Sequence, residues 1–189
     1  MQRDSGLAPI DPPRAWFLVL GSFPSRRSLE LGQYYGHRRN HFWELMGMLT
    51  GMPMPAGYEL RLQRLAEAGI AVWDLVASCS REGSLDRDIL DELPNPVGDF
   101  VAGRPGIAGI ALNGGKAAEI FRMRVAPTLG RGPLAIGEIM EWRPPGTRSR
   151  SVLVSRMPST SPVPTRGFKS AADKAPGWLS FYGAVMNRI

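Results

Sequence analysis

The sequence has little of what metal sites, disulfide frameworks and membrane spans require. Its 189 residues include one cysteine, Cys79, and two histidines. One cysteine excludes a disulfide framework, and together with two histidines it leaves few ligands for a zinc site. No apolar run approaches the roughly 18 residues of a membrane-spanning helix, and the N-terminus lacks the apolar core of a secretory signal. We therefore expect a cytoplasmic protein (beside the nucleoid in a bacterium, nuclear in a eukaryote) with no metal, no cofactor and no membrane contact.

Basic residues outnumber acidic ones. The 23 Lys and Arg against 17 Asp and Glu give a formal net charge of +6, and the pI is about 10.1. This balance favours an anionic partner such as nucleic acid, although the charge alone fits a basic surface without a partner equally well. The length predicts one domain. We expect residues 1–14 to form a loose arm and residues 15–189 a single domain that acts as a monomer.

The most informative stretch runs from Phe17 to Trp43. An apolar run at 17–20 stops at Gly21, which predicts a buried strand that ends in a loop. The loop is long, polar and aromatic, and apolar residues spaced as on a helix face begin just after His41. A strand, a long loop and a helix in this order are typical of the ligand-binding edge of an open α/β sheet.

The rest of the chain repeats the alternation of apolar strands and helices. Further strands are predicted at 70–73, 107–112 and 151–155, a short helix around 85–90, and a small peripheral strand or hairpin near Trp142. The pattern predicts an α/β fold, a three-layer α/β/α domain with a central, mainly parallel four-stranded sheet. Polar residues follow each strand, at 21–40, Asp74, Asn113 and 159–166, so parallel strands would bring them to one edge.

Several of these segments resemble a known family. GSFPSRRSL, GQYYGH and NHFW resemble the first motif of the hypoxanthine-DNA (deoxyinosine) glycosylases, in the uracil-DNA glycosylase superfamily. YGHRRNHFW is similar in spacing to the mismatch-specific uracil-DNA glycosylases, and MPSTSPVPTR resembles the second superfamily motif. The resemblance implies a monofunctional DNA glycosylase of base excision repair that flips uracil or hypoxanthine out of DNA and releases the free base without metal or cofactor.

The two candidate catalytic residues are Asn40, which the resemblance implies, and His37, a histidine of the same loop. Asn40 matches the Asn of the family's N-x-F-W run and would position the attacking water. An Asn directly before an amphipathic helix is also a good N-cap, and this alternative stays open. His37 could polarise the carbonyl of the base or contact a phosphate, and a loop histidine with neither role is the equal alternative.

A base pocket is expected from the strand ends, and its predicted residues are Gly21, Ser22, Phe23, Tyr35, Asp74 and Asn113. Tyr35 matches the stacking aromatic of the related enzymes, and of two adjacent tyrosines only one can face inward. Asp74 as a carboxylate only accepts hydrogen bonds, which suits the ring N–H of uracil and hypoxanthine and repels the bare ring nitrogen of cytosine and adenine. A turn-capping role or an arginine partner is the alternative for Asp74.

Contacts to the DNA backbone are expected from a second set of residues, Ser25, Lys116, Ser159, Thr160, Ser161 and Arg166. Ser159 and Ser161 match the phosphate-binding serines of the second motif, and residues 163–166 could wedge into the duplex. Lys116 follows Asn-Gly-Gly at a helix N-terminus, which can accept a phosphate, although an ordinary turn fits the same letters.

Two departures from the superfamily pattern support a rival interpretation. Phe23 and Met157 stand where other superfamily members carry a catalytic Asp, Asn or His. A non-catalytic binder of damaged DNA would share the basic surface and the loops but would release no base. A small-molecule α/β enzyme is a weaker third interpretation, since no glycine fingerprint or catalytic triad spacing is present.

Overall fold

A five-stranded sheet forms the centre of the protein in the computed structural model, which describes residues 3–80, 90–130, 132–147, 150–163, 165 and 167–189. The strand order is β3-β2-β6-β8-β7, and all neighbours are parallel except β7, which pairs antiparallel with β8. The strands are β2 (Phe17–Gly21), β3 (Ile70–Asp74), β6 (Gly109–Asn113), β7 (Ile139–Trp142) and β8 (Val152–Met157).

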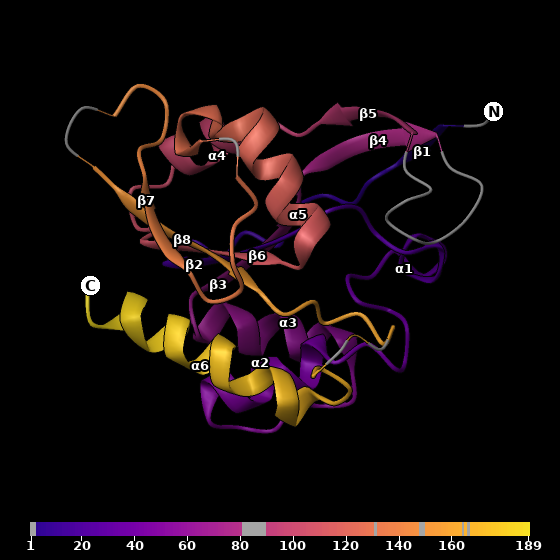
Figure 1. The fold of residues 1–189 in the computed structure, drawn as a ribbon. Helices are drawn as coiled ribbons and strands as arrows, with labels where there is room; N and C mark the ends of the chain where they lie inside the picture. The colour runs from indigo at the N-terminus through magenta and orange to yellow at the C-terminus, as the bar shows by residue number, and fades with distance from the viewer. Residues whose placement is uncertain (1–2, 81–89, 131, 148–149, 164, 166) are drawn as a thin grey trace.

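Helices cover both faces of this sheet, which confirms the three layers (Figure 1). One face carries α2 (Phe42–Thr50), α3 (Tyr58–Glu67) and α6 (Ala171–Met186); the other carries α4 (Val97–Ala102) and α5 (Gly115–Ile120). A short α1 (Arg26–Leu31) precedes α2, and a π-helical turn (Phe121–Val125) and a 3-10 turn (Pro127–Leu129) follow α5.

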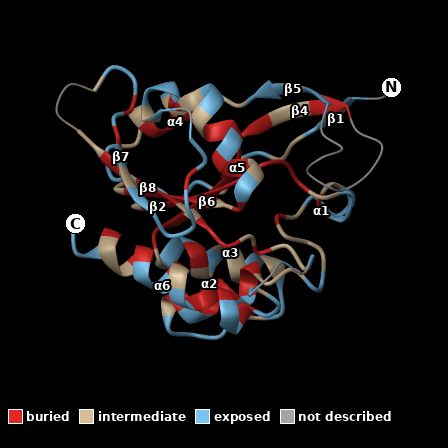
Figure 2. Ribbon diagram, viewed as in Figure 1, coloured by how far each residue is buried: buried red, intermediate tan, exposed pale blue. Residues whose placement is uncertain are grey.

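The central strands are apolar along their whole length because helices cover them on both sides. All residues of β2 and β3 are buried, and the red strands in Figure 2 lie between the helical layers. Such continuous apolar runs are typical of parallel sheets. Buried apolar side chains from Ala15 to Val185 form one cluster.

The sheet has five strands, not the four expected. The fifth is β7, at the position where Trp142 suggested a peripheral strand. Only Trp142 of its four residues is buried, since β7 lies at the edge of the sheet. A short edge strand buries too little apolar surface to give a clear sequence signal.

The N-terminal segment also differs from the loose arm that was expected. Residues Arg3–Ser5 form β1, which pairs with β4 (Val76–Ser80), and β4 pairs with β5 (Leu90–Pro94) in a second, antiparallel sheet. Ile10 then bridges to Val72 of the central sheet. The helix expected around 85–90 lies outside the described residues except for Leu90, which belongs to β5. No helix of the described chain is long and apolar enough to cross a membrane.

Candidate functional site

Gly21 and Asp74 lie side by side where β2 and β3 end. A Cβ atom added to Gly21 would lie 2.2 Å from Oδ1 of Asp74, so the carboxylate occupies the space that any other residue would fill. Asp74 is 4% exposed, and the side chain of Asn95 donates to its backbone carbonyl at 2.9 Å. The strand ends therefore present a carboxylate next to a backbone without a side chain.

Tyr35 reaches this place from the loop after β2. Its hydroxyl oxygen lies 3.6 Å from the position of the added Gly21 Cβ, and its ring stacks on Phe42 with 3.7 Å between centroids. Burial and then the Asp74 charge raise the pKa of Tyr35, so its hydroxyl stays protonated. Tyr34 instead is buried and donates to the carbonyl of Leu7 at 3.2 Å. The pair divides as expected, with Tyr34 in the core and Tyr35 at the strand ends.

Asn113 connects three segments of the site. Its Nδ2 donates to the hydroxyl of Tyr35 (3.0 Å) and to Oγ1 of Thr160 (2.9 Å), and its Oδ1 accepts from the N–H of Thr160 (2.9 Å). Both amide protons are thus used within the protein. The geometry differs from the predicted base-binding role, because Asn113 holds the Tyr35 loop against the loop after β8.

Thr160 was predicted to contact DNA, but the structure gives it a different place. It is 1% exposed, and its hydroxyl accepts from Asn113. Its neighbours Ser159 and Ser161 are half-buried, and each hydroxyl oxygen accepts a backbone N–H, from Ser161 (3.2 Å) and Val163 (3.3 Å) respectively. Thr160 therefore anchors the loop, while the two serines keep hydroxyl protons to donate.

Asn40 and His37 lie in one tight turn before α2. The N–H of Asn40 donates to the carbonyl of His37 at 2.8 Å, and Oδ1 of Asn40 accepts the N–H of Phe42 at 3.0 Å. The capping alternative for Asn40 is thus present in the geometry. Nδ1 of His37 accepts the N–H of Arg39 at 3.2 Å, so Nε2 is the ring nitrogen that remains for an outside partner.

The remaining predicted residues divide between the core and the surface. Ser22 and Phe23 are each 8% exposed, and Ser25 caps α1 by accepting the N–H of Ser28 at 3.2 Å. Lys116 lies at the start of α5, with its ammonium 3.8 Å from Glu119. Arg166 lies outside the described residues, as does Pro164 of the predicted wedge.

Lys174 is a site residue that sequence reasoning missed. It is 1% exposed, and its ammonium contacts the ring Nδ1 of His41 and the carbonyl of Ser161, both at 2.9 Å. It lies four residues before Trp178 and hence on the buried face of α6. A lysine in an apolar helix stripe is the sequence signal that could have found it.

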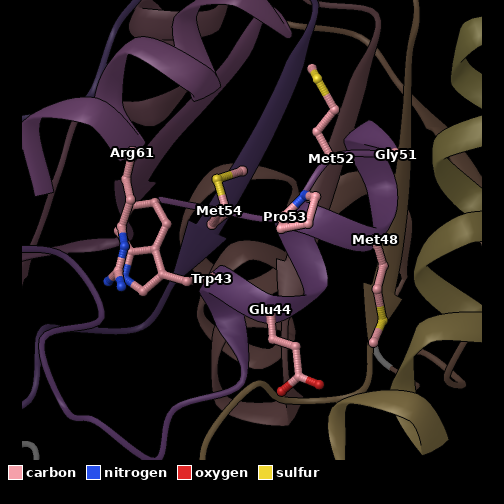
Figure 3. Close-up of a pocket in the computed structure, with 9 residues that line it drawn as sticks. Trp43, Glu44, Met48, Gly51, Met52, Pro53, Met54 and Arg61 are labelled. Atoms are coloured by element: carbon pink, nitrogen blue, oxygen red, sulfur yellow. The ribbon is translucent and has the colours of Figure 1, made fainter. Parts of the chain in front are cut away.

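A separate hollow lies beside the C-terminal end of α2 (Figure 3). Its volume is about 620 Å³, and it contains none of the predicted site residues. Its lining residues are Trp43, Glu44, Gly47, Met48, Gly51, Met52, Pro53, Met54 and Arg61. Within the described chain, no three His, Cys, Asp or Glu side chains are grouped to hold a metal ion.

Two proteins with similar sequences are hypoxanthine DNA glycosylases. The chain is 33% identical over 118 residues to the hypoxanthine DNA glycosylase of Methanosarcina barkeri, a stretch that covers 62% of this chain and 75% of that protein. It is 40% identical over 103 residues to the hypoxanthine DNA glycosylase of Methanosarcina acetivorans, covering 54% and 65% respectively. No protein-family model matches the chain.

A solved structure resembles the whole fold. It is the solution structure of a proposed uracil DNA glycosylase from Methanosarcina acetivorans, with a TM-score of 0.73 and 26% identity over 98% of this chain and 99% of that one. The fold therefore extends the similarity beyond the aligned sequence segments. With 33% identity over 75% of the M. barkeri protein, and with a fold shared along the whole chain, the protein belongs to the hypoxanthine DNA glycosylase family, within the uracil-DNA glycosylase superfamily.

Proposed function

We propose that the protein is a monofunctional glycosylase of base excision repair that hydrolyses the N-glycosidic bond of a deaminated base, uracil or hypoxanthine, flipped out of DNA. The observation that carries the proposal is the meeting of Gly21, Tyr35 and Asp74 at one edge of the sheet. A flipped base needs an aromatic surface, a hydrogen-bonding group for its edge and room to enter. Tyr35 supplies the aromatic surface and Asp74 the hydrogen-bonding group, and the missing side chain of Gly21 leaves room for the Asp74 carboxylate at the strand ends.

Tyr35 is the stacking platform in this proposal. Phe42 covers one face of its ring, and Asn113 holds its hydroxyl from the side. A ring held in this way loses little freedom when a base stacks on its other face, so most of the stacking energy remains available for binding.

Asp74 selects the base. Uracil and hypoxanthine present a ring N–H where cytosine and adenine present a bare acceptor nitrogen, and a carboxylate only accepts hydrogen bonds. The normal bases would leave the buried carboxylate facing another acceptor, which is costly in a site that excludes water. Discrimination then follows from hydrogen-bond polarity, and both deaminated bases remain candidates.

Asn40 positions the water. Its Oδ1 caps the first N–H of α2, and a carbonyl oxygen has a second lone pair that can orient a water molecule. The base departs with the electron pair of the glycosidic bond, the water oxygen bonds to C1′ of the sugar, and the released proton ends on the base. His37 has Nδ1 occupied by the N–H of Arg39, and in this proposal its Nε2 donates to a base carbonyl or a phosphate.

The lysines support simple hydrolysis rather than strand cleavage through a Schiff base. They are Lys116, Lys169 and Lys174. Lys174 is buried against α2, Lys116 faces Glu119, and Lys169 lies exposed before α6. We place no amine at the sugar, as a Schiff-base mechanism would require.

The experiment that tests this function is base release from duplex oligonucleotides that carry one uracil or one hypoxanthine, with cytosine and adenine duplexes as controls. We expect free uracil, free hypoxanthine or both by mass spectrometry, and an abasic strand that breaks only after alkali. Tight binding to these duplexes without any released base would contradict the proposal. Strand cleavage before alkali would contradict its monofunctional part.

A further inference from the structure

The ammonium of Lys174 is buried without a carboxylate partner among the described residues. Lys174 lies in the first turn of α6 and is 1% exposed. The adjacent Asp173 is exposed, and its Oδ2 accepts the backbone N–H groups of Lys169 and Ser170, both at 2.9 Å. Burial lowers the pKa of Lys174. Burying a cation without a counter-ion is unfavourable, so the position of this charge calls for a functional explanation.

The partners of Lys174 are the two loops that carry the predicted site residues. Its ammonium donates to the carbonyl of Ser161 and to Nδ1 of His41, the residue after Asn40. Burial, and after it the Lys174 charge, lowers the pKa of His41, which favours the neutral ring that accepts this bond. The N–H of His41 in turn donates to the carbonyl of Thr160 at 2.9 Å.

The loop after β8 turns its carbonyl oxygens toward the helices. Pro158 accepts from Nε1 of Trp178 at 3.0 Å, Thr160 from the N–H of His41, and Ser161 from Lys174. Carbonyl oxygens repel phosphate, and here three of them are removed from the surface of the loop. The hydroxyls of Ser159 and Ser161 already accept backbone N–H groups, so their protons are left to donate to an outside acceptor.

We propose that Lys174 is a positioning residue whose buried positive charge beneath the Ser159–Ser161 loop makes this loop a binding site for a phosphate of the DNA backbone. The proposal rests on the proposed function, because it takes DNA as the ligand. The two serine hydroxyls contact the phosphate. The ammonium attracts the phosphate indirectly, through the Ser161 peptide to which it is bonded and through its electric field. Hydrogen bonds that involve an ionised group are roughly twice as strong as neutral ones.

The test measures DNA affinity rather than chemistry. Fluorescence anisotropy with a duplex that carries a stable abasic-site analogue gives the Kd at several salt concentrations for the native enzyme, Lys174→Met and Lys174→Gln. Methionine keeps the length of the stem, and glutamine keeps a neutral donor for the Ser161 carbonyl. The control is Lys169→Met, which removes one exposed charge five residues earlier.

We expect both Lys174 variants to bind about 10- to 100-fold more weakly than Lys169→Met, as the loss of a charge-assisted contact implies. The slope of log Kd against log salt should fall by about one, as expected when one phosphate contact is lost. At saturating enzyme, the control Lys169→Met should keep the native single-turnover rate, because its side chain is exposed and lies outside the site. Lys174→Gln should keep a melting temperature nearer to native than Lys174→Met, because methionine leaves the Ser161 carbonyl and Nδ1 of His41 without a donor.

Three results would overturn the proposal. The first is an affinity of both variants equal to that of Lys169→Met. The second is a native affinity and a native salt slope in Lys174→Gln, which would show that a neutral hydrogen-bond donor suffices and that the charge of Lys174 is not needed. The third is additive losses in Lys174→Met combined with Ser161→Ala, because a residue that acts through Ser161 must couple to it. A native enzyme that binds DNA but releases no base would refute the proposed function and leave this test valid.

Discussion

At the scale of single residues, Asp74 makes the most specific chemical claim. Its carboxylate fills the space above Gly21, and it is nearly fully buried. Asp74→Asn keeps the shape and adds a donor, so the variant can bond to the bare ring nitrogen of a normal base. The preference for a deaminated base over a normal base should therefore fall, because the variant binds the deaminated base less well and the normal base better.

We expect Asp74→Asn to release the preferred deaminated base at least about tenfold more slowly, since one charge-assisted hydrogen bond is lost. The ratio of its rates on uracil and cytosine duplexes, or on hypoxanthine and adenine duplexes, should shrink. Asp99→Asn makes the same chemical change at an exposed position of α4 and serves as the control. An unchanged ratio would remove Asp74 from base recognition.

From the strand pattern alone, the positions of site residues could be predicted only where a residue ends an apolar strand. Gly21 and Asp74 could be placed because they end two apolar strands, and parallel strands end at the same edge. Asn113 was placed correctly at the third strand end, but its bonds to Tyr35 and Thr160 join residues 78 and 47 positions apart. Sequence spacing carries no information about which way an amide turns between such loops.

At the scale of elements, Asn113 holds together the loops after β2 and β8. Asn113→Ala removes three hydrogen bonds and leaves the buried N–H of Thr160 without its partner. We expect the free energy of unfolding to fall by about 2 to 4 kcal/mol, because an unsatisfied buried donor adds to the lost bonds. Urea unfolding checks this value, with Asn187→Ala at the exposed end of α6 as the control. A loss below that of the control would show that the loops are held elsewhere.

Elements with a strong local period were predictable, and elements defined by distant pairing were not. The helix after His41 was expected from its apolar spacing; α2 ends at Gly51 and α3 just before Gly69, and both glycines have a positive φ. By contrast, β1 has three residues and pairs with a strand more than 70 positions away. Nothing in the polar N-terminal residues signals such a partner, whereas Trp142 did indicate the peripheral strand that the structure shows as β7.

At the scale of the whole molecule, the fold brings segments from the entire chain to one edge of the sheet. The loop after β2, the end of β3, the end of β6 and the loop after β8 meet there, and α6 supports them from beneath through Lys174 and Trp178. The three-layer architecture and this convergence follow from the order of strands and helices. The support from α6 was missed, because the only sequence signal for it is one lysine among the apolar residues of the helix face.

The central claim is that this edge hydrolyses the glycosidic bond and that Asn40 positions the water. The most direct measurement is the single-turnover rate of base release from the preferred duplex by the native enzyme, Asn40→Ala and Asn40→Ser. Serine is a good helix cap, so it should restore most of the roughly 1 kcal/mol of stability that Ala loses. It does not place a carbonyl oxygen where the amide had one.

The account predicts that both variants release base at least about 100-fold more slowly than the native enzyme, the scale expected when a positioned catalytic group is lost. Asn40→Ser should nevertheless melt close to the native temperature. Release by Asn40→Ser at the native rate would contradict the account, because Asn40 would then be a helix cap and the water would be positioned by another group.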